Sequence, residues 1–169
     1  MNGIQHRIAV RPAAPADVEA LVALVRGLAY HEGKAAAAHV TPAALSAWMF
    51  GADPAFEALL AALDGRPVGY LAFYQGFSLF RGERVLLVEN LYVEEDARGY
   101  GVGRRLLAAA AAEAGRRGLG RLEINVRSTS RAARAFYERL GITAAGESVY
   151  RAEDEALAAI AAGSSEPAP

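Results

Sequence analysis

The first residues whose types and spacing could bind a ligand form the run Arg98-Gly99-Tyr100-Gly101-Val102-Gly103. This run follows an apolar stretch and begins an Ala- and Leu-rich segment. Glycines between a strand and a helix let the main chain approach a ligand closely, and the N–H groups at a helix N-terminus favour phosphate oxygens. The run therefore predicts a site for an anionic, pyrophosphate-bearing ligand, with Arg104 and Arg105 nearby. The alternative is a glycine-rich helix start that binds no ligand, since short glycine-rich motifs also occur at sites without a ligand.

A second candidate is Glu89, a carboxylate within the otherwise apolar run Val85 to Val93. An unpaired carboxylate is costly to bury, so this side chain is expected to face a cleft or a cationic partner. It could act as a base or anchor a cationic amine. The other interpretation is an outward-facing residue on a strand that is less buried than its composition indicates.

A third candidate is Tyr137, in the segment Ala135 to Gly141. A phenol with a pKa of about 10 stays protonated at neutral pH, so it could donate a proton to a leaving thiolate. Without further context, a tyrosine that caps the core is the commoner role. His31-Glu32 adds another carboxylate, although most such pairs lie in polar loops.

Composition excludes several classes of protein. The 169 residues carry a net charge of −1 and are 53% hydrophobic, which predicts one soluble domain and favours neither nucleic acid nor an anionic membrane as a partner. There is no cysteine, and the three histidines show no His-x-x-x-His pairing, so we expect no disulfide and no metal site. The N-terminus lacks an apolar signal core, and we expect a cytoplasmic protein.

The elements that must position these residues follow from periodicity and turn signals. Irregular connections are expected at His31–Lys34 and Phe77–Arg84, and a hairpin turn at Asp64-Gly65. The order predicts an α/β (α+β) fold with a mixed sheet and helices on both faces. The ordered core should span about residues 7–162, with flexible ends at 1–6 and 163–169. The predicted strands are 7–11, 56–63, 68–75, 85–93, 122–126 and 148–151, and the predicted helices are 15–30, 41–50, 101–117, 130–141 and 154–162.

Taken together, these motifs resemble the GCN5-related N-acetyltransferase (GNAT) superfamily. Its Arg-x-x-Gly-x-Gly signature corresponds to Arg98, Gly101 and Gly103, and Ala135 to Gly141 stands where the family has "FYxxxG". The resemblance covers about residues 7–161. It implies a mostly antiparallel sheet with splayed central strands in a single acetyltransferase domain that spans residues 1–169.

Several further segments resemble the diamine acetyltransferases, a subgroup that includes spermidine/spermine and thialysine N-acetyltransferases. Leu87 to Val93 stands where that subgroup has "LEDLYV", although Asn90 replaces an acidic residue, which weakens a site for a dication. The resemblance implies a homodimer that uses acetyl-CoA and a small-molecule amine such as a diamine, a polyamine or a thialysine-like compound. The other segments that carry this likeness are Leu28 to Glu32, Phe50-Gly51, Phe73-Tyr74 and Phe77-Ser78.

The resemblance also implies roles for individual residues. Tyr137 would be the general acid for the CoA thiolate, and Glu89 would face the acceptor amine, with Glu32 and Asn90 beside it. Ser130 stands where the family often has Asn, and would both cap its helix and reach the cofactor. The implied cofactor-binding residues are Leu91, Tyr92, Val93, Arg98, Gly99, Tyr100, Gly101, Val102, Gly103, Arg104, Ser130 and Tyr137.

A chain without cysteine has no thiol to form an acyl-enzyme, so direct transfer in a ternary complex is expected. An unperturbed Glu, with a pKa of about 4.3, is a poor direct base for an amine of pKa about 10.4. We therefore expect Glu89 to position the amine and pass its proton through water, and a main-chain N–H near Leu91 to stabilise the oxyanion. The alternatives are another amine (a protein N-terminus, an aminoglycoside or an amino acid) and a CoA-binding module without turnover.

Overall fold

The computed structural model describes residues 6–146, 149–150 and 152–162 of the chain. These residues form two compact units, the first ending at Asn125 and the second beginning at Val126. Each unit is described by itself. Within the described residues, no helix combines the length and the apolarity that crossing a membrane requires.

The first unit is built on a five-stranded sheet in the order β1-β2-β3-β4-β5. Strands β1 to β4 pair antiparallel in succession, and β5 pairs parallel with β4. This arrangement confirms the predicted mixed, mostly antiparallel sheet. The strands are β1 (Ile8–Pro12), β2 (Glu57–Leu63), β3 (Arg66–Ser78), β4 (Glu83–Val93) and β5 (Leu122–Ile124).

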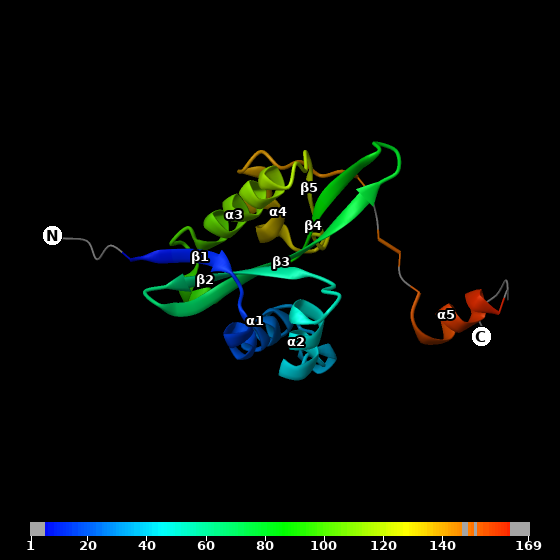
Figure 1. The fold of residues 1–169 in the computed structure, drawn as a ribbon, viewed down its shortest axis with the longest axis horizontal. Helices are drawn as coiled ribbons and strands as arrows, with labels where there is room; N and C mark the ends of the chain where they lie inside the picture. The colour runs from blue at the N-terminus through cyan, green and yellow to red at the C-terminus, as the bar shows by residue number, and fades with distance from the viewer. Residues whose placement is uncertain (1–5, 147–148, 151, 163–169) are drawn as a thin grey trace. The chain divides into compact units, whose positions relative to one another are not determined.

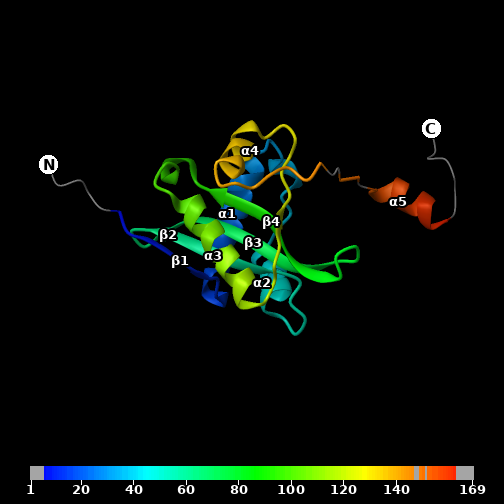
Figure 2. The same ribbon diagram turned by 90° about the horizontal axis from the view of Figure 1, so that it is seen from above.

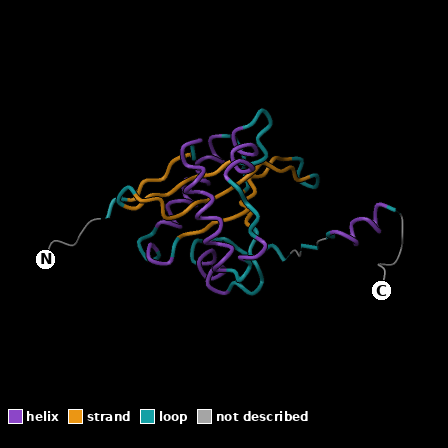
Figure 3. Tube along the Cα trace, turned by 90° about the horizontal axis from the view of Figure 1, so that it is seen from below, coloured by secondary structure: helices purple, strands orange, loops and turns teal. Residues whose placement is uncertain are grey.

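Helices cover both faces of this sheet, as predicted. In Figure 1, α1 (Val18–His31) and α2 (Pro42–Phe50) lie below the strands, and α3 (Val102–Arg116) lies above them. Figure 2 shows α3 crossing the strands, and Figure 3 shows the same layers as helices and strands in two colours. Short 3-10 turns occupy Pro15–Asp17, Ala35–Ala37 and Glu95–Ala97.

The alternation of side chains along β3 divides the core between the two faces. Tyr70 and Ala72 belong to the cluster that packs with α1 and α2, together with Leu21 of α1. Phe73 points the other way, where the Arg117 guanidinium lies 5.4 Å from the centre of its ring. Both faces of the strand are therefore buried, each against different helices.

Two predictions about the central strands need correction. The connection expected at Phe77–Arg84 is a hairpin, because β3 continues until Ser78 pairs with Glu83. Main-chain pairing extends beyond the buried part of the strands, and Phe77 itself is exposed. The run 85–93 is also not buried on both faces throughout, since Glu89 is exposed where one face of β4 borders a cavity.

The second unit contains α4 (Arg131–Glu138) and α5 (Asp154–Ala161). The helix predicted to reach Gly141 ends at Glu138, whose carbonyl accepts a hydrogen bond from the Gly141 N–H. Gly141 has a φ of 78°, the left-handed conformation that commonly ends a helix. The predicted strand at 148–151 lies partly outside the described residues, and the described positions 149 and 150 are not in a strand. The ends predicted to be flexible lie outside the described residues, except position 6.

Candidate functional site

A β-bulge in β4 sets the position of Glu89. In the β3–β4 register, Ala72 lies opposite Asn90 and Phe73 lies opposite Val88, so Glu89 is an extra residue without a partner. A bulge of this kind bends its strand and redirects a side chain. As a result, Glu89 and Asn90, although adjacent in the chain, both line a cavity on the α1–α2 side of the sheet.

The bulge coincides with the point where the pairing of β4 with the edge strand β5 ends. β5 pairs with β4 only through Leu86, Leu87 and Val88, and the Asn125 N–H donates to the Val88 carbonyl at 3.3 Å. Within the described residues, the β4 segment from Glu89 to Val93 has a strand partner only on the side of β3. One edge of this segment therefore lies outside the sheet ladder among the described residues.

The glycine-rich turn lies between β4 and α3, as predicted. Gly99 has a φ of 86° and Gly101, which immediately precedes α3, has a φ of 87°. A Cβ added to either residue would meet no described atom within 4 Å, so glycine serves the left-handed backbone and the adjacent space is open. The Arg105 N–H donates to the Gly101 carbonyl at 3.1 Å, and the N–H groups that precede it fall outside the intrahelical ladder.

Two arginine side chains, Arg98 and Arg66, bind the connection between β4 and α3. Arg98 Nε donates to the Val93 carbonyl at 3.0 Å, so part of this guanidinium anchors the turn to the end of β4. Arg66, from the start of β3, forms ion pairs with Glu94 and Asp96 in the same connection. Sequence analysis did not find Arg66, because nothing in its local pattern indicates a partner so distant along the chain.

Tyr100 anchors the tip of the turn to the N-terminal segment. Its ring packs edge-on against His6, with 4.7 Å between ring centres. His6 Nδ1 in turn lies 2.6 Å from Asp64 Oδ2 in the β2–β3 turn. One edge of the Tyr100 ring thus contacts the N-terminal segment, while the residue stays 48% exposed.

The cavity beside Glu89 has a volume of about 510 Å³ and is bounded by α1, α2 and strands β2 to β4. Its walls are mostly apolar, and Glu89 is the only charged side chain among the described residues that line it. Tyr70 also lines it, with 2% of the residue exposed, and its hydroxyl has no hydrogen-bond partner among the described residues. Burial, followed by the negative charges of Glu32 and Glu89, raises the pKa of Tyr70, so the phenol stays protonated.

Sequence analysis did not single out Tyr70, because a tyrosine at an alternating position of a strand is typical of a core residue. An unpaired buried hydroxyl is the signal that distinguishes it, and this signal exists only after folding. A buried polar atom without a partner is costly, at about 1–3 kcal/mol, which favours a ligand or water atom at this point of the cavity.

A smaller hollow of about 270 Å³ adjoins the cavity and is lined by Glu32, Lys34, His39 and Asn90. Lys34 Nζ lies 3.2 Å from Glu32 Oε2, so a cation of the protein already pairs with this carboxylate. The Asn90 side chain, which borders both hollows, donates to the Glu89 carbonyl at 2.8 Å. The structure therefore gathers the three predicted substrate residues, Glu32, Glu89 and Asn90, around two adjoining hollows.

Two predicted site residues, Ser130 and Tyr137, belong to the second unit. Tyr137, in α4, has 8% of its surface exposed and packs edge-on against Phe136 with 5.2 Å between ring centres. Burial raises the pKa of its phenol, which keeps it protonated at neutral pH. Ser130 precedes α4, but within the described residues its hydroxyl makes no capping hydrogen bond, so the predicted side-chain cap is wrong. Its carbonyl instead accepts from the Arg134 N–H.

Comparison with known proteins places these features in context. The family model described as "Acetyltransferase (GNAT) family" matches residues 24–142. Among curated proteins, thialysine N-epsilon-acetyltransferase of Bos taurus is 28% identical over 166 residues, which cover 91% of this chain and 97% of the relative. The enzyme of the same name from Mus musculus is 29% identical over 164 residues, covering 90% of this chain and 96% of the relative.

Solved structures show the same fold. An integron cassette protein from the mobile metagenome of V. cholerae superposes with a TM-score of 0.76 at 21% identity, covering 91% of this chain and 97% of that chain. A ribosomal-protein-alanine N-acetyltransferase from Brucella melitensis biovar Abortus 2308 gives a TM-score of 0.67 at 26% identity, covering 88% of this chain and all of that chain, 100%.

Proposed function

Because the chain belongs to the acetyltransferase (GNAT) family, whose members use acetyl-CoA, we propose that it moves the acetyl group of acetyl-CoA to a primary amine of a small molecule. The observation that carries this proposal is the bulge at Glu89. It turns a carboxylate toward a cavity at the point where β4 and β5 separate, so an amine and a thioester could meet across one strand.

Acetyl-CoA is assigned to the open edge of β4 and to the glycine-rich turn. Main-chain groups of Leu91, Tyr92 and Val93 hydrogen-bond the pantetheine arm, because this stretch has no strand partner on the side of β5 among the described residues. N–H groups from Arg98 to Arg104 bind the pyrophosphate, which suits their freedom at the start of α3. Ser130 contributes from the second unit. The matched family model covers residues 24–142 and so crosses the boundary between the two units, which supports the proposal of one acetyltransferase domain over 1–169.

In the proposed reaction, the amine nitrogen attacks the thioester carbonyl directly in the ternary complex. Glu89 orients the ammonium and passes its proton to water, and a main-chain N–H near Leu91 stabilises the oxyanion. The carbon–sulfur bond then breaks, Tyr137 donates its phenolic proton to the CoA thiolate, and the surplus proton of the attacking nitrogen returns through water to the tyrosinate. The products are the N-acetylated amine and CoA. Burial raises the pKa of Tyr137, so its phenol is protonated at neutral pH before each turnover.

Diamines, polyamines and thialysine-like compounds are the acceptors to test first. The printed names of the relatives supply thialysine, and Glu32 and Asn90 lie beside Glu89 where a second polar group of the acceptor could bind. By the same resemblance we propose a homodimer in the cytoplasm, with neither nucleic acid nor membrane as a partner.

The decisive experiment measures thiol release from acetyl-CoA in the presence of diamines, thialysine, lysine and an aminoglycoside. We expect release that depends on a small primary amine, with the N-acetylated product identified by mass spectrometry. Saturable acetyl-CoA binding without release under any condition would instead identify a CoA-binding module. Release only with an aminoglycoside, or only with a peptide N-terminus, would contradict the acceptor class.

A further inference from the structure

We infer that the preferred acceptor is a primary amine with a single positive charge and an apolar body, which fills the cavity bounded by α1, α2 and strands β2 to β4 while its ammonium lies at Glu89. This inference rests on the proposed transfer to a primary amine, and within that class it favours a singly charged acceptor over the diamines and polyamines that the resemblance puts first for testing. Its evidence is the chemistry of the cavity walls, which no comparison with a relative supplies.

The first step is the balance of charge in the cavity. Glu89 is the only charged side chain among its described lining residues, so the cavity can neutralise one ammonium. Beyond that point, the walls consist of aliphatic and aromatic side chains that include Trp48, Met49 and Phe56. A second ammonium pushed among them would lose its hydration without gaining a partner, which is strongly unfavourable.

The second step concerns the adjoining hollow, where a dication would need its second partner. Glu32 already forms an ion pair with Lys34 at 3.2 Å. Asn90, which borders both hollows, donates through Nδ2 to the Glu89 carbonyl, and its Oδ1 offers an ammonium a neutral acceptor without the countercharge that a carboxylate supplies. A second ammonium of the acceptor would therefore have to compete with Lys34 for Glu32.

The third step concerns the size of the cavity and two side chains on its wall. Its volume, about 510 Å³, lies within the range typical of small-molecule sites. Tyr70 lines it at 2% residue exposure, and its buried hydroxyl has no hydrogen-bond partner among the described residues. Trp48 lies on the wall with 61% of its surface exposed, so its indole is accessible to a ligand in the cavity.

Hexylamine and cadaverine are a matched pair of probes, because they differ only in a terminal methyl group and a second ammonium. Transfer to either forms the same amide bond and releases CoA. We expect kcat/KM for hexylamine to exceed that for cadaverine by about tenfold or more, because only hexylamine buries an uncharged end. A lower or equal value for hexylamine would overturn this inference and leave the proposed function intact. Transfer to neither amine, nor to any other small amine, would overturn both.

Ala44 and Ala43 provide a matched pair of variants on α2. Both are exposed, but only Ala44 lines the cavity. Ala44→Phe should fill the cavity and lower kcat/KM for hexylamine about tenfold or more, because the apolar body loses its buried contacts. Ala43→Phe should leave it within about twofold, as is typical of surface substitutions. Equal effects of the two substitutions would contradict the assignment of the cavity.

Trp48, the single tryptophan of the chain, reports binding without turnover. Its fluorescence should change saturably when hexylamine is added to the wild-type protein, and much less with Ala44→Phe. No fluorescence change at concentrations that saturate turnover would place the apolar body elsewhere and overturn the inference.

Discussion

Tyr137 and Glu89 carry the proposed chemistry at the scale of single residues, and their environments differ as the two roles require. Tyr137 is buried, and burial raises the pKa of its phenol, so the phenol holds its proton at neutral pH until a strong base such as a thiolate forms. Glu89 is exposed at a bulge and faces a cavity, which suits contact with a soluble amine. The two side chains can therefore be tested separately.

Replacing Tyr137 with Phe should lower kcat about 100-fold or more, because the leaving thiolate loses its general acid. The affinity for acetyl-CoA, measured by calorimetry, should stay near the wild-type value, since the aromatic ring remains. Wild-type turnover in this variant would exclude the proposed role of Tyr137 as the acid.

Replacing Glu89 with Gln should lower kcat/KM for the amine about 10-fold to 100-fold, because an amide neither attracts the ammonium nor relays its proton. Steady-state kinetics with each substrate varied in turn will separate the two substrates. The KM for acetyl-CoA should not change. An effect limited to acetyl-CoA would contradict the position of Glu89 on the acceptor side.

At the scale of elements, the start of α3 depends on the left-handed backbone of Gly101. Gly118, just beyond the other end of α3, has a φ of 69°, and a Cβ there would likewise meet no described atom within 4 Å. These two glycines therefore lie at opposite ends of α3 but share a positive φ, which would strain any residue with a Cβ. They make it possible to separate loss of stability from loss of ligand binding.

Gly101→Ala and Gly118→Ala should each lower the free energy of unfolding by about 1 kcal/mol, since alanine resists a positive φ. Only Gly101→Ala should also raise the KM for acetyl-CoA, because it changes the N–H groups proposed to bind the pyrophosphate. Chemical denaturation and steady-state kinetics measure the two effects. A similar rise in KM for both variants would indicate a general loss of stability and not a local site.

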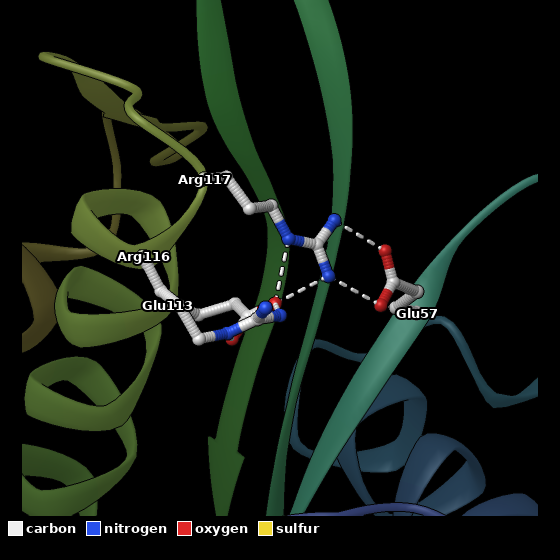
Figure 4. Close-up of polar contacts among 4 residues, drawn as sticks. All are labelled: Glu57, Glu113, Arg116 and Arg117. Carbon is white, nitrogen blue, oxygen red and sulfur yellow. Dashed lines mark hydrogen bonds and ion pairs between the residues drawn. The ribbon is translucent and has the colours of Figure 1, made fainter.

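The C-terminal end of α3 is joined to β2 by a network of charged side chains, shown in Figure 4. Arg117 donates to both oxygens of Glu57 at 2.6 Å and, through Nε, to Glu113 at 2.6 Å. Hydrogen bonds from Arg116, and then from Arg117, lower the pKa of Glu113 to about 2 from its ordinary value of 4.5. A pKa lowered by folding means that the ionised carboxylate stabilises the folded state.

Glu113→Gln should therefore reduce the free energy of unfolding at pH 7, by about 2 kcal/mol, the scale of hydrogen bonds to charged groups. The stabilisation in the wild type is complete above pH 4.5 and is lost as the pH falls toward 2. Urea denaturation should thus show the two proteins converging across this interval. Glu19→Gln, at an exposed position of α1, is the control and should show no such convergence. A constant difference at every pH would contradict the role of ionised Glu113.

At the scale of the whole molecule, the resemblance to the diamine acetyltransferases predicts a homodimer. Light scattering coupled to size-exclusion chromatography should give twice the 17.8 kDa of one chain. The mass should stay constant as the protein is diluted through the micromolar range, as expected of a stable interface. A monomer at all concentrations would contradict this prediction without affecting the proposed chemistry.

Local patterns in the sequence were sufficient for most of the elements and for the candidate chemistry. Thr41 and Pro42 mark the start of α2, the pair Asp64-Gly65 marks a hairpin, and the glycines from Gly99 to Gly103 mark the turn before α3. These signals depend on backbone preferences of neighbouring residues, which a sequence carries directly. Glu89 was also visible, because a carboxylate in an apolar run is conspicuous.

Long-range strand pairing and packing determine the features of the site that local sequence patterns did not predict. The bulge at Glu89 depends on the register between β3 and β4, which joins residues far apart in the chain. The unpaired hydroxyl of Tyr70 depends on the helices that close over it. Residue types and their spacing thus indicated an acetyl-transfer chemistry, whereas the shape and charge of the acceptor cavity arise only when separate segments of the chain pack together.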